Sequence, residues 1–274
     1  MLVRILTSLV LLAVVVVVWM FLDTLLLNVV IWLLCALALI EIFKATGLIA
    51  WRGLTALAMA QALVIPFMRT QFVGDFALPA LFLIALGYFA LLVKNFGSMK
   101  LAECSGAFLF GTLIPLFFSS AIYIRDLHGA QLGAFYLLIA LGAAWLSDTC
   151  AYFVGTFFGK HKLAPKVSPK KTIEGTVGGL VLSTGILFLL GLLYQNLVGA
   201  RVNFAMLALI SPVLSMMGML GDLSASAIKR EYGVKDFGHI MPGHGGVLDR
   251  FDSVLFTLPA VYLAALHLEL ITLL

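Results

Sequence analysis

The sequence predicts an all-α, polytopic integral membrane protein with about nine transmembrane helices and a cytoplasmic N-terminus. Of its 274 residues, 63% are hydrophobic and only 11% are charged, whereas a soluble domain is usually about half apolar and about a quarter charged. Backbone polar groups must be paired inside a bilayer, so membrane-spanning segments are helices or closed barrels. The apolar runs are long rather than alternating over about ten residues, which excludes a barrel.

Nine apolar runs approach or exceed the roughly 20 helical residues needed to cross a hydrocarbon core about 30 Å thick. The first begins after Arg4, is too long for a signal-peptide core and has no small-residue cleavage site before Asp23, so we expect an uncleaved helix. The sixth and ninth are long enough to tilt or to project beyond the bilayer. The predicted spans are about 4–22, 25–43, 53–70, 76–94, 104–124, 130–158, 175–198, 203–223 and 247–273.

The distribution of Lys and Arg between the predicted loops indicates the orientation. All of these residues fall on one side of the membrane except Arg69, Arg125 and Arg201. The positive-inside rule assigns the crowded side to the cytoplasm, which places the N-terminus inside and the C-terminus outside. The net charge of +4 reflects this asymmetry and suits anionic lipid head groups, so it does not indicate nucleic-acid binding.

The chain divides by chemistry near residue 125. Residues 1–125, with about five helices, contain few polar groups within their spans and are expected to form a scaffold. Residues 126–274, with about four helices, carry acids and hydroxyls at helix ends and are expected to hold the site. Two long loops in this part, 159–174 and about 223–246, are predicted to be cytoplasmic. No internal repeat is evident, which disfavours an inverted-repeat transporter.

Acidic side chains near one membrane face form a candidate metal site. Asp249 and Asp252 stand three residues apart at the start of the ninth span and would share a helix face. Two such carboxylates repel each other unless a cation lies between them; solvated interfacial acids beside Arg250 are the alternative. Asp222 and Asp148 lie near the ends of the eighth and sixth spans. Oxygen ligands without cysteine favour Mg²⁺, which binds one or two carboxylates plus substrate phosphates.

A glycine-rich turn, Pro242 to Gly246, precedes the acidic pair. Glycine lets backbone N–H groups approach a phosphate, and a helix start adds a favourable dipole; a flexible turn is the alternative. His244 has the chemistry to bind a phosphate or to protonate a leaving group. Cationic clusters in both loops would suit a polyanionic nucleotide, although positive-inside charge alone also explains them. They comprise Lys160, Lys162, Lys166, Lys170, Lys171, Lys229, Arg230 and Lys235.

The order of these residues carries a family resemblance. Ser226, Lys229-Arg230, Lys235-Asp236, His244-Gly245-Gly246 and Asp249-Arg250-Phe251-Asp252 follow one another at fixed spacing. This pattern resembles the phosphatidate cytidylyltransferase (CDP-diacylglycerol synthase) family, as do SDTCAYFVG (147–155) and KVSPKKTIEG (166–175). Met241, where a branched apolar residue or Phe is expected, is a mild departure. The strong likeness covers roughly residues 145–252.

The resemblance implies that CTP and phosphatidic acid react to give CDP-diacylglycerol and pyrophosphate. It also implies a homodimer. The predicted topology places the active site on the cytoplasmic side, where CTP is, and we expect the location to be a bacterial inner membrane. One anionic phosphate must attack another, so a metal ion and several cations have to neutralise charge. A cytidylyl- or phosphotransferase acting on an isoprenoid or ether lipid is an alternative, and a transporter or channel with acids near mid-bilayer is another.

The resemblance suggests the metal role of Asp222 and Asp249, and the other roles are hypotheses from the chemistry of the residues. Asp222 and Asp249 hold Mg²⁺, Asp252 helps as a further ligand or by contacting one, and Asp148 belongs to the same polar cluster. A second, monovalent cation is left open. Lys235 and His244 stabilise the departing pyrophosphate. The phosphates of CTP or lipid are bound by Lys170, Lys171, Lys229, Arg230 and Arg250.

Overall fold

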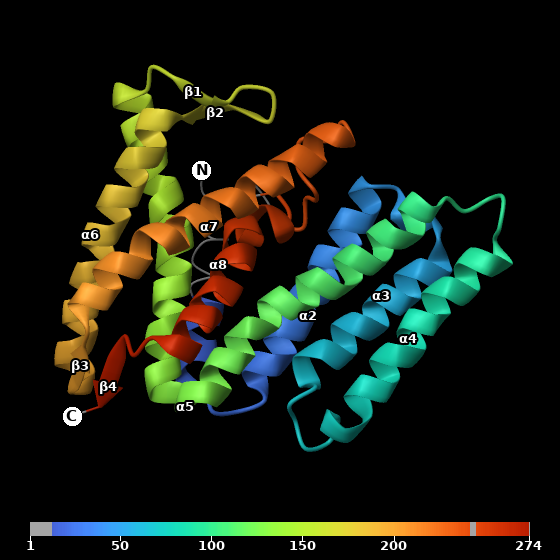
Figure 1. The fold of residues 1–274 in the computed structure, drawn as a ribbon, viewed down its shortest axis with the longest axis horizontal. Coiled ribbons are helices and arrows are strands. Elements are labelled where there is room, and N and C mark those ends of the chain that lie inside the picture. Colours follow the sequence, from blue (N-terminus) through green and yellow to red (C-terminus); the bar gives the residue numbers. More distant parts are fainter. Residues whose placement is uncertain (1–12, 242–244, 274) are drawn as a thin grey trace. The chain divides into compact units, whose positions relative to one another are not determined.

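The structure is a computed structural model that describes residues 13–241 and 245–273, most of them helical (Figure 1). Two short 3-10 turns, η1 (Leu48–Ala50) and η2 (Ile65–Phe67), flank one of the helices. Two pairs of short strands complete the chain. The helices are α2 (Leu26–Ala45), α3 (Arg52–Val64), α4 (Gly74–Lys94), α5 (Leu101–Phe158), α6 (Ile173–Val198), α7 (Phe204–Glu231) and α8 (Leu248–His267), and the strands are β1 (Lys162–Ala164), β2 (Ser168–Thr172), β3 (Ala200–Val202) and β4 (Ile271–Leu273).

Long apolar helices confirm the prediction of an all-α membrane protein. In the described part of the chain, α2, α4, α5, α6 and α7 are long and apolar enough to cross a membrane. α5 contains the predicted fifth and sixth spans, and Gly129, with φ 72° and ψ 173°, interrupts the helical backbone between them. The first predicted span lies partly outside the described residues. The count of nine and the N-terminal orientation stay predictions.

The C-terminal end of α7 differs from its prediction. The sequence predicts that the eighth span ends near residue 223 and that a loop follows, but α7 continues to Glu231. Its last turn carries Lys229 and Arg230, which a helix C-terminus favours because of its negative dipole. The helix ends just before Gly233, whose φ of 66° lies in the left-handed region. Lys229 and Arg230 therefore lie on a helix and not in the predicted loop.

The predicted loop 159–174 contains an antiparallel hairpin. β1 pairs with β2 so that Lys162 lies opposite Thr172 and Ala164 opposite Ser168. Thr172 also begins the next element, since its side chain accepts a hydrogen bond of 3.1 Å from the backbone N–H of Gly175 at the N-terminus of α6. The hairpin is thereby joined to a membrane-spanning helix without a flexible linker.

The chain forms two compact units, Met1–Ile122 with Val234–Arg250, and Tyr123–Gly233 with Phe251–Leu274. In the first, α2 packs on α3 and α3 packs on α4 (Figure 1). A polar link ties α4, α3 and α5, because the Tyr88 hydroxyl donates to Gln61 Oε1 at 2.8 Å and Gln61 Nε2 donates to Thr112 at 2.9 Å. The sequence places residues 234–250 with the C-terminal region, whereas the structure packs them in the first unit.

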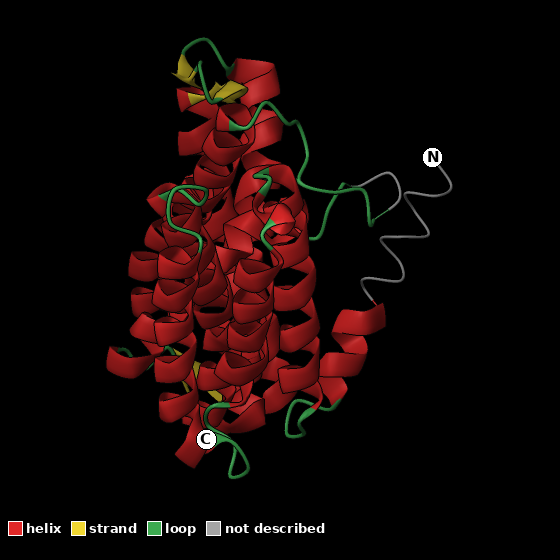
Figure 2. Cartoon of the chain, turned by 90° about the vertical axis from the view of Figure 1, so that its right-hand side faces the viewer, coloured by secondary structure: helices red, strands yellow, loops and turns green. Residues whose placement is uncertain are grey.

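The second unit is built around the packing of α6 along α7. With 26 residues, α6 is about 39 Å long at 1.5 Å per residue, enough to cross a bilayer core. The β1–β2 hairpin precedes α6 and the β3–β4 pair follows it, so the two strand pairs lie at opposite ends of this helix (Figure 2). The hairpin end carries the polar residues of the candidate site.

Candidate active site

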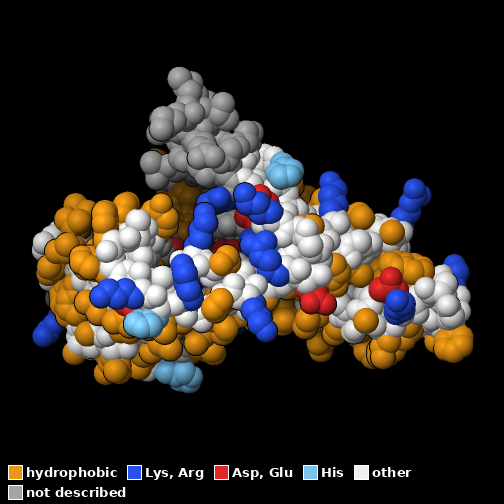
Figure 3. Space-filling view, turned by 90° about the horizontal axis from the view of Figure 1, so that it is seen from above, with side chains coloured by type: hydrophobic (Ala, Val, Ile, Leu, Met, Phe, Trp, Pro, Cys, Tyr) orange, Lys and Arg blue, Asp and Glu red, His pale blue; other side chains and the backbone are white. Residues whose placement is uncertain are grey.

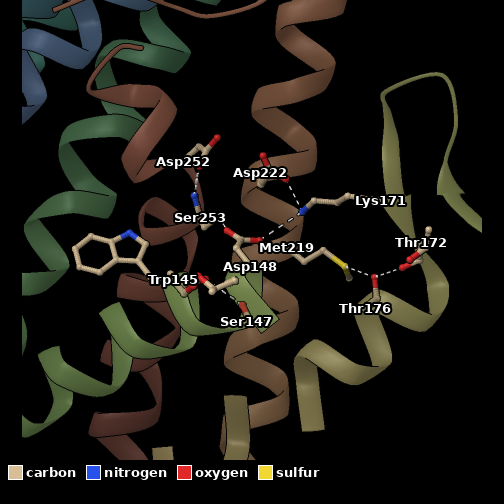
Figure 4. Close-up of polar contacts among 12 residues, drawn as sticks. Trp145, Ser147, Asp148, Lys171, Thr172, Thr176, Met219, Asp222, Asp252 and Ser253 are labelled. Atoms are coloured by element: carbon tan, nitrogen blue, oxygen red, sulfur yellow. Dashed lines mark hydrogen bonds and ion pairs between the residues drawn. The ribbon is translucent and has the colours of Figure 1, made fainter. Parts of the chain in front are cut away.

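A lysine and two aspartates from three different elements meet in the second unit (Figure 4). The Lys171 ammonium on β2 forms an ion pair with Asp222 on α7, and it lies 3.6 Å from Asp148 Oδ1 on α5. The side chains of Lys171 and Asp222 are 22% and 23% exposed. The cluster is therefore partly shielded from water, where opposite charges interact more strongly than at an open surface.

Small residues on α7 bring the acidic side chains together. A Cβ on Gly218 would come within 3.2 Å of Thr257 on α8, and a Cβ on Gly221 would collide with the backbone carbonyl of Asp252. These glycines lie three residues apart and share one helix face. Their lack of a side chain lets α7 approach α8 closely, and Asp222 is the next residue along α7.

Asp252 and Ser253 on α8 extend the cluster. The Ser253 hydroxyl donates to Asp148 Oδ2 at 2.7 Å (Figure 4). Asp252 is 7% exposed and accepts a 2.8 Å hydrogen bond from the backbone N–H of Ser253. It is repelled by the charges of Asp222 and Asp148 and attracted by that of Lys229. This part of the site thus holds three acids and two cations.

The protonation of Lys171 reflects this environment. Burial disfavours its charged form, but the carboxylates of Asp222 and Asp148 outweigh that cost and raise the pKa of the ammonium above its usual value. Lys171 therefore remains a cation at neutral pH. Lys171 thus lies beside Asp148 and Asp222 and contacts their carboxylates, and its binding of a phosphate stays a prediction.

Other predicted cations have different surroundings. Lys170 precedes Lys171 in β2 and is exposed; successive strand residues point to opposite faces. The Arg230 guanidinium donates to the backbone carbonyl of Val167 at 3.3 Å, which links the end of α7 to the β1–β2 turn. Lys229 is 8% exposed. Seen from the hairpin end, Lys and Arg side chains gather on this face (Figure 3).

The remaining predicted residues that the structure describes belong to the first unit. Asp249 Oδ2 accepts hydrogen bonds from the backbone N–H groups of Phe237, at 2.8 Å, and Gly246, at 3.0 Å. Lys235 and Arg250 are exposed. His244 lies outside the described residues. Asp249 is assigned to a different unit from Asp222 and Asp252, so their convergence on one ion stays a prediction.

A carboxylate that the sequence interpretation overlooked is Glu41 on α2. It is 2% exposed and accepts backbone hydrogen bonds from Val247 and Leu248, each 2.9 Å long, at the start of α8. These N–H groups directly follow the glycine-rich turn that the sequence interpretation offers to a phosphate, and their acceptor is Glu41. The sequence did contain a signal for Glu41, because an ionisable residue inside an apolar span is costly to bury and is by default expected to be functional.

Comparison with known proteins assigns the chain to a family. The sequence profile described as "Cytidylyltransferase family" matches residues 2–268. The chain belongs to the cytidylyltransferase family. It is 39% identical to a phosphatidate cytidylyltransferase of Staphylococcus epidermidis over 235 residues, covering 83% of this chain and 85% of the relative. It is 37% identical to a phosphatidate cytidylyltransferase of Bacillus subtilis over 243 residues, covering 86% and 87%.

A cytidylyltransferase handles nucleotide phosphates, so the fit of its acids to a metal ion is relevant. Among the described residues, no group of three or more His, Cys, Asp or Glu side chains is arranged to hold a metal ion. Mg²⁺ commonly uses only one or two carboxylates and completes its shell with water and substrate phosphate. Asp222 and Asp252 carry oxygen donors of the kind that Mg²⁺ prefers, and Asp222 is paired with Lys171 in this structure. The chemistry of these donors is compatible with Mg²⁺, and binding of the ion stays a prediction.

Proposed function

We propose that this protein is a phosphatidate cytidylyltransferase, which converts CTP and phosphatidic acid to CDP-diacylglycerol and pyrophosphate. The main support is its family membership over residues 2–268, together with relatives of that name that match more than four fifths of the chain. The partly buried cluster of Asp148, Lys171 and Asp222 provides charges suited to a phosphate reaction.

The proposed reaction needs no covalent enzyme intermediate, because phosphatidic acid already carries a nucleophilic oxygen. That oxygen forms a bond to the α-phosphorus of CTP. The bond from the α-phosphorus to the oxygen that bridges to the β-phosphorus breaks, and its electron pair leaves with pyrophosphate. Both reactants are anions, so fixed positive charges lower the barrier by opposing their repulsion. Half-buried Lys171 and buried Lys229 are the cations of the second unit that we propose for this role.

Asp222, Asp252 and Asp249 are the residues proposed to hold Mg²⁺. Bound there, the ion would polarise the phosphates and neutralise developing charge. Asp148 orients Lys171 and Ser253 through the contacts described above. Lys170, Arg230 and Arg250 are proposed to contact the phosphates of CTP or lipid, and Lys235 and His244 to stabilise pyrophosphate. A second, monovalent cation stays open.

The proposed location is a bacterial inner membrane with the site facing the cytoplasm, where CTP is present. The positive-inside distribution of Lys and Arg supports this orientation. The proposed assembly is a homodimer, which light scattering of the purified protein in detergent would detect as twice the mass of one 274-residue chain.

The activity is tested with purified enzyme, radiolabelled CTP and a panel of lipid phosphates that includes phosphatidic, isoprenoid and ether-lipid phosphates. We expect Mg²⁺-dependent CDP-diacylglycerol from phosphatidic acid. A product formed only from another lipid phosphate would instead support the alternative cytidylyltransferase.

The metal role is tested with Asp222→Asn and Asp249→Asn, compared with Asp75→Asn, an exposed acid at the start of α4. We expect the first two to lower turnover about 100-fold or more, as loss of several kcal/mol of charge stabilisation implies, and the third to have no effect. Near wild-type turnover in Asp222→Asn would contradict the metal role of that residue.

A further inference from the structure

Glu41 is a buried acid in the first unit that the reaction scheme does not use. It lies on the apolar helix α2 and is 2% exposed. Its oxygens engage consecutive amides, Oε1 with the N–H of Val247 and Oε2 with the N–H of Leu248, both at 2.9 Å. A negative charge at a helix N-terminus is favourable, and hydrogen bonds to a charged acceptor are stronger than neutral ones.

Two glycines allow the Glu41 carboxylate to reach these amides. A Cβ on Gly238 would lie 2.5 Å from Oε1, and a Cβ on Gly246 would lie 2.5 Å from Oε2. Any side chain at either position would therefore displace the carboxylate. Gly246 belongs to the glycine-rich turn, where the sequence suggests a role in approaching phosphate; in the structure its close neighbour is Glu41.

A second carboxylate holds the same turn from its C-terminal side. Asp249 Oδ2 accepts hydrogen bonds from the backbone N–H groups of Gly246 and Phe237. One oxygen therefore holds these two residues, nine positions apart in the sequence, close to each other. The N–H of Met241 donates to the Gly245 carbonyl at 3.0 Å. Glu41 and Asp249 also repel each other electrostatically. Backbone amides between them keep both charges in place.

We propose that Glu41 is a positioning residue for the cytidylyl transfer. By fixing Val247 and Leu248, it sets the first turn of α8 and hence the direction in which Asp249 and Arg250 project. The same helix carries Asp252 and Ser253 in its next turn. This inference rests on the proposed function, because the residues it positions are those assigned to metal and phosphate.

The test compares Glu41→Gln with Glu103→Gln in the full-length enzyme. Glu103 is a matched control, since it is a half-exposed carboxylate that accepts the N–H of Lys100 at 2.7 Å at the start of another helix of the same unit. Glutamine keeps the size of Glu41 but offers one acceptor oxygen instead of two. We expect kcat to fall about tenfold or more, the scale of a charged hydrogen bond. The thermal midpoint should fall as well, because one of the two buried N–H groups loses its acceptor. Glu103→Gln should retain the wild-type kcat.

An unchanged kcat in Glu41→Gln would overturn the proposal, whatever happens to the thermal midpoint. If kcat and the midpoint both fall, Glu41→Asp decides between the two roles. Recovery of the midpoint without recovery of kcat supports positioning, because the shorter carboxylate restores the charge but not the geometry. Parallel recovery of both indicates a structural role only and overturns the proposal.

Hydrogen exchange separates this inference from the proposed function. In Glu41→Gln, the amides of Val247 and Leu248 should exchange faster than in the wild type, while Glu103→Gln leaves them unchanged. If the wild type forms no CDP-lipid but exchange responds in this way, the proposed function fails and the restraint by Glu41 stands. Unchanged exchange at both amides overturns the restraint itself.

Discussion

At the scale of single residues, the Lys171 ammonium is what allows three acids to lie near one another. Asp148, Asp222 and Asp252 interact electrostatically in the second unit, and Lys171 forms ion pairs with the first two. Like-charged carboxylates at such proximity are unfavourable without a cation. Its neighbour Lys170 points to the other face of β2 and is exposed.

The first prediction compares Lys171→Met with Lys170→Met. Methionine removes the charge but retains much of the side-chain length. Because the cluster is partly buried, we expect Lys171→Met to lower the free energy of unfolding by about 1–3 kcal/mol, between the values for exposed and buried pairs. Lys170→Met should change it by less than about 0.5 kcal/mol. Thermal unfolding in detergent measures the stability of both variants. Equal losses of stability would contradict the conclusion that Lys171, and not Lys170, forms the stabilising ion pairs.

The pH dependence of this contribution follows from the raised pKa of Lys171. Burial opposes its charge, but Asp222 and Asp148 raise the pKa above the usual value of 10.5. A raised pKa in the folded state contributes stability below the unfolded pKa, and this stability is lost as pH rises through the folded value. The wild type should therefore exceed Lys171→Met in thermal midpoint by a constant margin from neutral pH to about pH 10, where both the ammonium and its carboxylate partners are charged. The margin should shrink at higher pH; a margin independent of pH would contradict the ion pair.

The sequence was sufficient to propose which acids belong to the site, but it did not show which residues they contact. Asp148 and Asp222 share Lys171 as a partner because β2 pairs back on β1, and the short, charged Ser168–Thr172 segment gives little strand signal. Glu41 could have been found, since it is an acid within an apolar run. Its partners could not, because Val247 lies 206 positions away in the sequence.

At the scale of elements, the approach of α7 to α8 depends on glycine. A Cβ on Gly221 would meet the backbone carbonyl of Asp252 and the Phe256 ring, and the carbonyl cannot yield without moving a helix. Close approach at small residues is a common way for membrane helices to associate. The sequence predicted both helices, but the interface between them depends on which face of each is turned inward, and an almost uniformly apolar helix does not reveal that.

The prediction for this interface compares Gly221→Ala with Gly185→Ala. A methyl group at 221 would collide with α8, whereas at 185 on α6 nothing lies within 4 Å. We expect Gly221→Ala to destabilise the enzyme by about 1–3 kcal/mol, the usual cost of overpacking. Its turnover should fall as well, because Asp222 and Asp252 move apart. Gly185→Ala should leave stability equal or slightly higher through its helix propensity. Equal midpoints for both variants would contradict the close approach.

At the scale of the whole molecule, chain order and spatial grouping differ. Residues 234–250 return to the first unit after the chain has built most of the second. The sequence divides the chain near residue 125 by the density of polar residues. It cannot reveal this return, because the contacts of Glu41 and Asp249 with the segment are made mostly through backbone amides, which every non-proline residue has.

The last prediction concerns orientation in the membrane. Lys162 on β1 and Arg201 on β3 are exposed and flank opposite ends of α6, so they should face opposite sides of the bilayer. In a variant lacking Cys35, Cys104 and Cys150, single substitutions Lys162→Cys and Arg201→Cys are treated with a membrane-impermeant maleimide on right-side-out vesicles. We expect R201C to react in intact vesicles and K162C only after the vesicles are opened, since the hairpin carries the cationic loop assigned to the cytoplasm. The reverse pattern would place the acidic cluster outside, away from CTP, and would contradict the proposed location. Reaction of both in intact vesicles would show that α6 does not cross the membrane.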